Sequence, residues 1–427
     1  QEVMKMFKRM YDNGYIYEKL EPQAYCDHCH KFLSDRELEI TCPKCGQTTK
    51  AEQCDNCQYV PTIEDMKDGV CLECKEKVVL KENKNLYLAL SKFQKNIEEY
   101  VEKNNGLWRV NAKNETNKYL KQGLVDRAVT RDLDWGVDIP IPGYESKKMY
   151  VWIEAVLGYI TATMKKCEEL GKNWEEFWKE EYDPTIYMVH GKDNIVFHSI
   201  IFNSLLMAME DNYHLVNTVV SSEYLNINDE KISKSKGNGT PAIELVEQYG
   251  VDPLRFHLIN NGPEKKDSNF TIEALIATNN GELLNKFGNL VNRTLKFKEL
   301  EEVPAGILNE DIKEKIEETY KLVGENIEKL EFKCASDIAM QLVEIANKYY
   351  DEQKPWIQKK EDIESFNNTI YTCSVIIANL ANIFEPFMPN ACEKIRKYLD
   401  IHEKSWELIE PKKGLKLENI EPLFTRI

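Results

Sequence analysis

Residues 1–20 open with hydrophobic positions that recur at helical spacing. Val3, Met6, Phe7 and Met10 fall on one face of a helix, and Asn13-Gly14 is a typical end signal. The pattern therefore predicts an amphipathic helix at the beginning of the chain. The residues Tyr15-Ile16-Tyr17 that follow predict a short strand.

Apolar runs in the middle of the chain alternate with helical stretches. The stretch 148–153 predicts a buried strand that leads into a helix over 154–166. The run 185–193 predicts a strand that ends in Gly-Lys-Asp, before a long apolar helix over 195–209. A doubly wound sheet binds its ligand beyond the carboxyl ends of its strands, so we expect a site after residue 190.

Two further regions are predicted to be helical. Residues 84–123 predict mostly exposed helices, and from about residue 271 the pattern is helical with few strand signals. Four long stretches repeat the helical period: 311–330, 335–353, 362–383 and 388–399. We expect an α-helical bundle of about five helices at the end of the chain.

Eight of the twelve cysteines form four Cys-x-x-Cys pairs. Each two-residue spacer lets two thiolates reach one ion, so the pairs predict two tetrahedral zinc sites, structural because four thiolates leave no open position. The spacing alone allows any of three pairings, and His28 and His30 rank below the cysteines as alternative ligands. The expected ligands are Cys26, Cys29, Cys42, Cys45, Cys54, Cys57, Cys71 and Cys74.

The composition narrows the function classes. The 427 residues hold 56 basic and 72 acidic side chains, a net charge of −16, which argues against a nonspecific nucleic-acid binder but permits a local basic patch. The chain has no apolar run of about 20 residues that could span a membrane. Paired cysteines with lone cysteines in apolar helical runs favour a reducing cytoplasm over a disulfide framework.

Lysine and serine alternate from Lys231 to Asn238, with a glycine at position 237. Ammonium groups neutralise phosphate charge, hydroxyl groups bond phosphate oxygens, and glycine lets the loop bend. The pattern predicts a loop that holds a chain of phosphates, and a solvated turn is the alternative.

The stretch Lys231–Ser235 resembles the KMSKS signature of class I aminoacyl-tRNA synthetases, with Ile232 in place of methionine. The zinc knuckles upstream, the stretches 151–159 and 191–198, and the C-terminal helices stand in the order found in methionyl-tRNA synthetases. The chain resembles that family over nearly its whole length.

The resemblance implies a set of site residues. The methionine side chain is expected to contact Trp152, Ala155, Tyr159 and His198. ATP is expected to contact Asp193 and Lys234, with Mg²⁺ accompanying it. The catalytic loop residues are expected to be Lys231, Ser233, Lys234 and Ser235. The tRNA anticodon is expected to contact Asn289, Arg293 and Trp356. For zinc, the family pattern is nested: the knuckles at 42–45 and 54–57 hold one ion, and those at 26–29 and 71–74 the other.

The resemblance also divides the chain into five parts. They are the end of a first catalytic half with its leading helix (1–22), a connective insertion (23–135) with zinc knuckles at 26–74, the second half of a Rossmann-type catalytic domain (136–218), a KMSKS-type loop and stem-contact region (219–275), and an α-helical anticodon-binding domain (276–427). The expected fold class is therefore α/β followed by all-α.

The function implied is ATP-dependent attachment of methionine to tRNA(Met) in the cytoplasm, without membrane contact. The other class I signature, His-x-Gly-His, does not occur among the seven histidines. We therefore expect a fragment that lacks the N-terminal half of the nucleotide-binding fold and is inactive in adenylation. We expect this chain to be a monomer, and the oligomeric state of the parent stays open.

Two alternatives remain at this stage. Leucyl, isoleucyl, valyl or cysteinyl enzymes of class I share the lysine loop, but the first three carry an editing insertion for which the residues before Trp135 leave no room, and the last uses zinc to bind substrate thiol. A zinc-knuckle tRNA-binding module without catalysis would have no use for the lysine loop beside Asp193.

Overall fold

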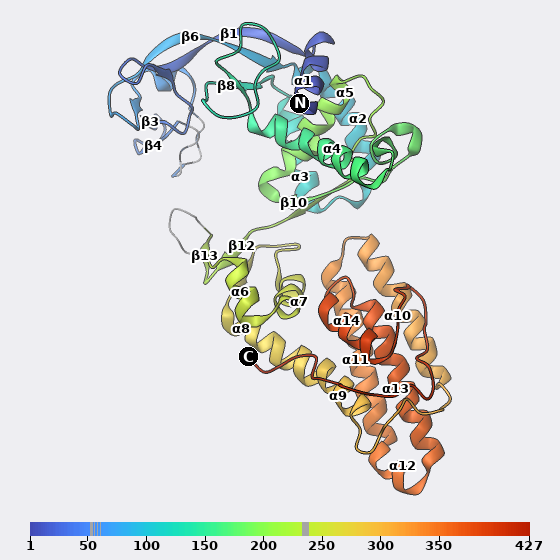
Figure 1. The fold of residues 1–427 in the computed structure, drawn as a ribbon. Helices are drawn as coiled ribbons and strands as arrows, with labels where there is room; N and C mark the ends of the chain where they lie inside the picture. The colour runs from blue at the N-terminus through green and yellow to red at the C-terminus, as the bar shows by residue number, and fades with distance from the viewer. Residues whose placement is uncertain (52–53, 55, 58, 60, 233–238) are drawn as a thin grey trace. The chain divides into compact units, whose positions relative to one another are not determined.

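The fold was obtained as a computed structural model that describes residues 1–51, 54, 56–57, 59, 61–232 and 239–427. It comprises two compact units, Gln1–Ser221 and Ser222–Ile427 (Figure 1). All twelve cysteines are free thiols. Across the described ranges, no helix combines the length and the apolar character needed to cross a membrane.

A long antiparallel ribbon in the first unit ends in the cysteine-rich segment (Figure 1). In this ribbon β1 (Ile16–Cys26) pairs with β6 (Val79–Leu88) over ten positions, from Ile16↔Leu88 to Tyr25↔Val79. The strands β2 (Lys31–Phe32) and β7 (Arg127–Ala128) complete the sheet in the order β2-β1-β6-β7. At the end of the ribbon a second sheet has the order β4-β3-β5, formed by β3 (Leu38–Thr41), β4 (Thr48–Lys50) and β5 (Val70–Cys71).

The strand β6 corrects the prediction of exposed helices from residue 84. Leu86 and Leu88 are fully buried, and they lie two residues apart because they share one face of a strand. Helices begin only afterwards, with Phe93 and Ile97 also buried. The leucines recur every second residue, and helical spacing follows them directly. The pattern therefore did not reveal where the strand ends and the first helix begins.

Helices and two short two-stranded sheets form the body of the first unit. The helices are α1 (Glu2–Asp12), α2 (Gln94–Asn104), α3 (Val110–Gln122), α4 (Val151–Leu170) and α5 (Phe202–Ala208). The strands are β10 (Tyr187–Gly191) paired with β11 (Thr218–Ser222), and β8 (Thr130–Arg131) paired with β9 (Lys148–Met149). The predicted first helix is confirmed, with Met6, Phe7 and Met10 buried.

The predicted strand over 148–153 is wrong beyond its first two residues. Tyr150 is extended and caps α4, so Val151 to Ile153 form the first helical turn. Ile153 is buried together with Val156, Leu157 and Ile160, at helical spacing. This packing overrides the preference of β-branched residues for strands.

The second unit begins with a small mixed sheet and three helices. The sheet order is β13-β12-β14, formed by β12 (Leu225–Ile227), β13 (Glu230–Lys231) and β14 (Ser268–Phe270). The helices are α6 (Ala242–Tyr249), α7 (Val251–Asn261) and α8 (Ile272–Thr278). Leu245, Leu254, Phe270 and Leu275 form their own small core.

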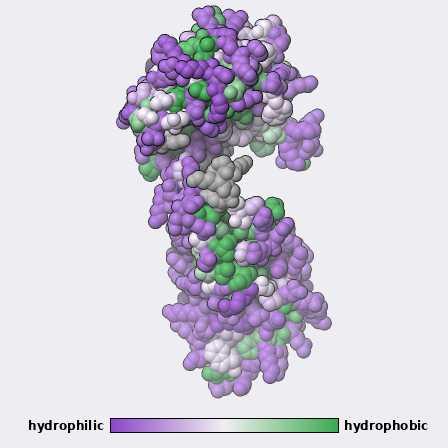
Figure 2. Space-filling model, turned by 90° about the vertical axis from the view of Figure 1, so that its left-hand side faces the viewer, coloured by the Kyte–Doolittle hydropathy of each residue, from purple (hydrophilic) through white to green (hydrophobic). Residues whose placement is uncertain are grey.

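The predicted helical bundle is confirmed in the rest of the second unit. After a π-helical segment, η8 (Asn279–Gly288), its helices are α9 (Asn289–Leu295), α10 (Glu310–Glu328), α11 (Phe332–Gln353), α12 (Pro355–Glu361), α13 (Ile363–Ile383) and α14 (Pro389–Tyr398). All residues of α13 from Thr369 to Ile383 are buried, which makes it the central helix. On the face seen in Figure 2, hydrophilic residues predominate and hydrophobic ones gather in small patches.

Candidate functional site

An aromatic cluster, made of Trp152, Tyr159, His190, Phe197 and His198, lies where α4 meets the end of β10. Trp152, Ala155 and Tyr159 occupy positions i, i+3 and i+7 of α4, so they share one helix face. The hydroxyl of Tyr159 lies 2.9 Å from Nε2 of His198. The ring of Trp152 stacks on Phe197 with 4.5 Å between centroids. The structure thus brings the expected pocket residues of α4 together with His198.

The hydrogen bonds of His198 fix its tautomer. Its Nδ1 lies 2.9 Å from the carbonyl oxygen of Asn194, which can only accept, so Nδ1 carries the proton. Nε2 then accepts from the Tyr159 hydroxyl. Burial lowers the pKa of His198, and burial lowers the pKa of His190 to about 4. Both imidazoles are therefore neutral at pH 7, and the cluster presents an uncharged, polarizable surface.

Asp193 lies on the short 3₁₀ turn Lys192–Asn194 that follows β10 directly. Its side chain is exposed, and the turn connects His190 to the helical segment that carries His198. The structure therefore places Asp193 beyond the carboxyl end of a strand, next to the cluster in the chain, as the sequence predicted.

The lysine loop is described only at its edges. Lys231 is the last residue of β13, and its ammonium lies 4.4 Å from the ring centre of Tyr224. Ser233, Lys234 and Ser235 lie outside the described residues. Their roles therefore stay predictions.

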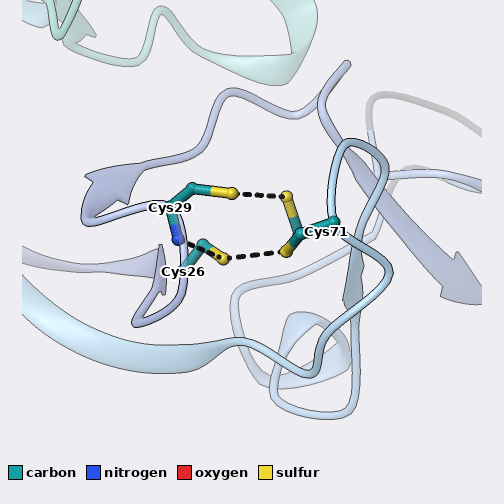
Figure 3. Close-up of side chains that lie close together, drawn as sticks. Cys26, Cys29 and Cys71 are labelled. Carbon is teal, nitrogen blue, oxygen red and sulfur yellow. Dashed lines mark hydrogen bonds between the residues drawn. The ribbon is translucent and has the colours of Figure 1, made fainter.

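The eight paired cysteines form two separate groups of four. In each group the sulfurs lie within 4.8 Å of one another: Cys26, Cys29, Cys71 and Cys74 form one, and Cys42, Cys45, Cys54 and Cys57 the other. This is the nested grouping that the resemblance implied. His28 and His30 belong to neither group among the described residues. Figure 3 shows the sulfur of Cys29 turned toward that of Cys71, 4.0 Å away.

The geometry of both groups fits zinc. Sulfur–sulfur distances are 3.4 Å for Cys26–Cys74, 3.6 Å for Cys42–Cys57 and 3.5 Å for Cys45–Cys54. A tetrahedral Zn–S bond of about 2.3 Å requires sulfurs about 3.8 Å apart. The backbone N–H of Gln47 and the side chain of Asn56 lower the pKa of Cys45 to about 6, whereas burial and the neighbouring sulfurs raise the pKa of Cys57 in the same group. The four thiols of this group therefore share protons unevenly.

The expected anticodon residues lie on α9 and α12 in the second unit. Asn289 and Trp356 are exposed, Trp356 by 48 %. Arg293, in contrast, is engaged within the protein: its guanidinium donates to Asp351 at 2.8 Å and to the backbone and side-chain oxygens of Asn347 at 2.9 and 2.8 Å. It also lies 4.1 Å above the ring of Tyr350.

Comparisons with known proteins agree with this arrangement. The family model for class I tRNA synthetases (M) matches residues 1–295, and the model for the anticodon-binding domain of methionyl-tRNA ligase matches residues 302–425. Methionine–tRNA ligase of Bacillus mycoides (strain KBAB4) is 43 % identical over 434 residues, which cover 100 % of this chain and 79 % of that protein. The chain belongs to the methionyl-tRNA synthetase family.

Other relatives extend the match. Methionine–tRNA ligase 1 of Alkaliphilus oremlandii is 40 % identical over 430 residues, again covering 100 % of the chain and 79 % of the relative. The crystal structure of Mycobacterium tuberculosis methionyl-tRNA synthetase bound by methionyl-adenylate has a TM-score of 0.78 at 23 % identity, covering 99 % of this chain and 80 % of that one. The fold is that of a class I synthetase catalytic domain with a helical anticodon-binding domain, and the protein is an aminoacyl-tRNA synthetase.

The sequence suggested that the N-terminal half of the nucleotide-binding fold is missing and that the chain is therefore inactive in adenylation. The family model matches from residue 1, and the chain spans 79 % of the length of the Bacillus mycoides enzyme. The idea that only the second half of the catalytic fold is present is therefore not supported. The inactivity deduced from it is not confirmed.

Sequence reasoning missed several residues that support the predicted ones. His190 and Phe197 each stack on a predicted pocket residue, and Tyr350 lies under Arg293. The one signal for His190 was its position at the end of an apolar run, just before Gly191. Phe197 read as part of an apolar helix, because stacking between rings leaves no mark on the spacing of one segment.

Proposed function

We propose that this chain activates methionine with ATP and transfers it to the 3′ end of tRNA(Met). The aromatic cluster carries the proposal. A thioether is apolar and polarizable, and it gains most from contact with uncharged aromatic faces. Tyr159 and His198 bond to each other, so they offer such faces without a net charge in the pocket.

The reaction has two steps. The methionine carboxylate attacks the α-phosphate of ATP, which forms methionyl-adenylate and releases pyrophosphate. The 3′ ribose hydroxyl of the tRNA then attacks the acyl carbon and releases AMP. Neither step needs a covalent enzyme intermediate, so positioning and electrostatic stabilisation supply the rate. The Mycobacterium tuberculosis relative was solved with methionyl-adenylate bound, the intermediate that this reaction requires.

The proposed roles follow from charge and position. Lys231 and Lys234 stabilise charge that develops on pyrophosphate, and the hydroxyls of Ser233 and Ser235 bond its oxygens. Asp193 binds the ribose or orients the bound substrate from the turn after β10. Mg²⁺ accompanies ATP through phosphate oxygens.

The two cysteine groups are proposed to hold structural zinc. The ligands are complete in each group, so the ions stabilise the end of the ribbon rather than react. Metal analysis of the purified protein should give two zinc ions per chain. A single ion per chain would disprove the two-site assignment, and Cys42→Ser should remove only one of the two.

Binding of the anticodon is proposed for Asn289, Arg293 and Trp356. Trp356 offers an exposed ring for a base to stack on, and Asn289 is exposed four residues before Arg293 on the same helix. The five domain boundaries set out above also remain part of the proposal.

Methionine-dependent ATP–pyrophosphate exchange tests the proposal on the unchanged chain. We expect exchange with methionine and none with leucine, isoleucine, valine or cysteine. Lack of exchange together with anticodon-dependent tRNA affinity would favour a binding module instead. The assay also decides whether a chain without His-x-Gly-His can form the adenylate.

Lys234→Ala separates catalysis from binding. It should lower exchange by roughly 100-fold while methionine affinity is retained, because the ammonium acts on charge that appears only in the transition state. Lys5→Ala is the control, since Lys5 is an exposed lysine outside the loop. Equal losses of exchange and of methionine affinity in Lys234→Ala would indicate a packing role.

A further inference from the structure

His190 has no assigned role, yet it is stacked on a proposed pocket residue. Its ring lies 4.3 Å from that of His198 with an interplanar angle of 20°. Tyr159 approaches His198 with its ring 5.7 Å away. His198 therefore contacts an imidazole at its face and a phenol hydroxyl at its Nε2 edge, and both contacts constrain the plane of its ring.

Hydrogen bonds hold His190 and His198 to the connection between β10 and the next helical segment. Nδ1 of His190 lies 2.9 Å from the carbonyl oxygen of Gly191, and Nδ1 of His198 lies 2.9 Å from that of Asn194. Both carbonyls can only accept, so both rings carry the proton on Nδ1. Each imidazole is neutral and each has one fixed orientation.

From this geometry we propose that His190 is a positioning residue of the amino-acid subsite. It rests on the proposed function. By stacking on His198, His190 fixes the ring plane in which Nε2 of His198 accepts from the Tyr159 hydroxyl. The pocket contacts that select a methionine side chain thus depend on a histidine that acts through another residue.

Three substitutions of His190 separate the stack from the hydrogen bond. His190→Ala removes both. His190→Phe keeps a flat ring but loses the N–H donor to Gly191. His190→Asn keeps an N–H at the position of Nδ1 but loses the ring. His214→Ala is the matched control, because His214 is another histidine of the first unit but bonds Glu180 and Asn217.

Calorimetric titration with free methionine measures the effect on the full chain. We expect the dissociation constant to rise about tenfold in His190→Ala and His190→Asn, and less than about twofold in His190→Phe. In ATP–pyrophosphate exchange the loss should fall on KM for methionine, with kcat unchanged. His214→Ala should leave methionine binding unchanged, and thermal melts of all variants show which are folded.

Each other outcome overturns the inference. Wild-type affinity in His190→Ala or His190→Asn means that the ring does not position His198. A loss in His190→Phe as large as that in His190→Ala, at equal melting temperature, means that the stack is not the cause. If the unchanged chain binds no methionine, the proposed function itself fails. If the unchanged chain binds methionine but the His190 variants bind it equally well, only the inference about His190 fails.

Discussion

The aromatic cluster of the first unit and the expected anticodon residues of the second unit, Asn289, Arg293 and Trp356, differ in how their polar groups are hydrogen-bonded. In the cluster, Tyr159 and His198 bond each other, and His198 is only 3 % exposed, whereas Tyr159 is 41 % exposed. In the helical bundle, the guanidinium of Arg293 donates hydrogen bonds to Asp351 and Asn347, while Trp356 is 48 % exposed. The first region therefore joins an exposed phenol to a buried imidazole, and the second joins a half-exposed indole to an arginine held within the protein.

The difference reflects the size of the ligands. An amino-acid side chain must be surrounded, so its site combines a buried residue, His198, with more exposed ones on α4. An anticodon base is offered by a large partner, so one exposed ring on a rigid support is enough. Arg293 also belongs to this support, because it joins α9 to α11.

The largest effect is expected for His198→Ala. The variant leaves the Tyr159 hydroxyl without its acceptor and removes the ring, which costs roughly 2–4 kcal/mol of methionine binding, so KM for methionine should rise about 100-fold. Filter binding of tRNA should not change. If tRNA affinity fell by the same factor, the two regions would not be independent sites.

Trp356→Ala should have the converse effect. Loss of one base–aromatic stack costs about 1–3 kcal/mol, so affinity for cognate tRNA should fall roughly 5- to 150-fold. KM for methionine in exchange should stay at the wild-type value. Trp406→Ala is a matched control, because Trp406 is also partly exposed in the second unit. Unchanged tRNA affinity in Trp356→Ala would contradict the stacking role.

Arg293→Lys tests whether this arginine stabilises the packing of α9 on α11 or contacts the anticodon directly. Lysine keeps the charge but cannot make the forked bonds to Asp351 and Asn347 or stack as well on Tyr350. We expect the free energy of unfolding of the second unit to fall by about 1–2 kcal/mol in urea melts. A large loss of tRNA affinity at unchanged stability would instead show direct contact with the anticodon.

The smallest effect is a pH dependence confined to the cluster. The pKa of His190 is about 4 in the folded chain because of burial, against about 6.5 when unfolded. Between these values the unfolded state binds more protons, so this contribution is fully present above pH 6.5 and is lost as the pH falls toward 4. Urea melts of the wild type and His190→Phe at pH 7, 6 and 5 should show a shallower decline in the variant. If the free energy of unfolding fell equally with pH in the wild type and in His190→Phe, His190 would not be the source of the pH dependence.

Sequence patterns could predict the members of each site better than their contacts. The Cys-x-x-Cys spacing named all eight sulfurs, but the nested grouping came only from resemblance, because knuckles far apart in sequence are joined by the β1–β6 pairing. Helical spacing placed Trp152 and Tyr159 on one face even though the beginning of the helix was misread as a strand.

The remaining misses have a common physical cause. That His190 stacks on His198, and that Asp351 and Asn347 take up Arg293, depends on how segments fold back on each other. Neither fact changes the period of hydrophobic residues along one segment. The sequence could therefore suggest Arg293 as a ligand for RNA, but not that both of its terminal guanidinium nitrogens already donate within the protein.

The ten paired positions between β1 and β6 determine how the ribbon that carries the cysteine-rich segment can be lengthened or shortened. Ile16, Ala24 and Cys26 are all buried and all even-numbered, so they share one face of β1. One residue added to each strand would turn the terminal cysteine to the opposite face from Ile16. Two residues added to each would preserve every face and extend the ribbon by about 7 Å. Viable insertions and deletions in this arm should therefore come in even steps.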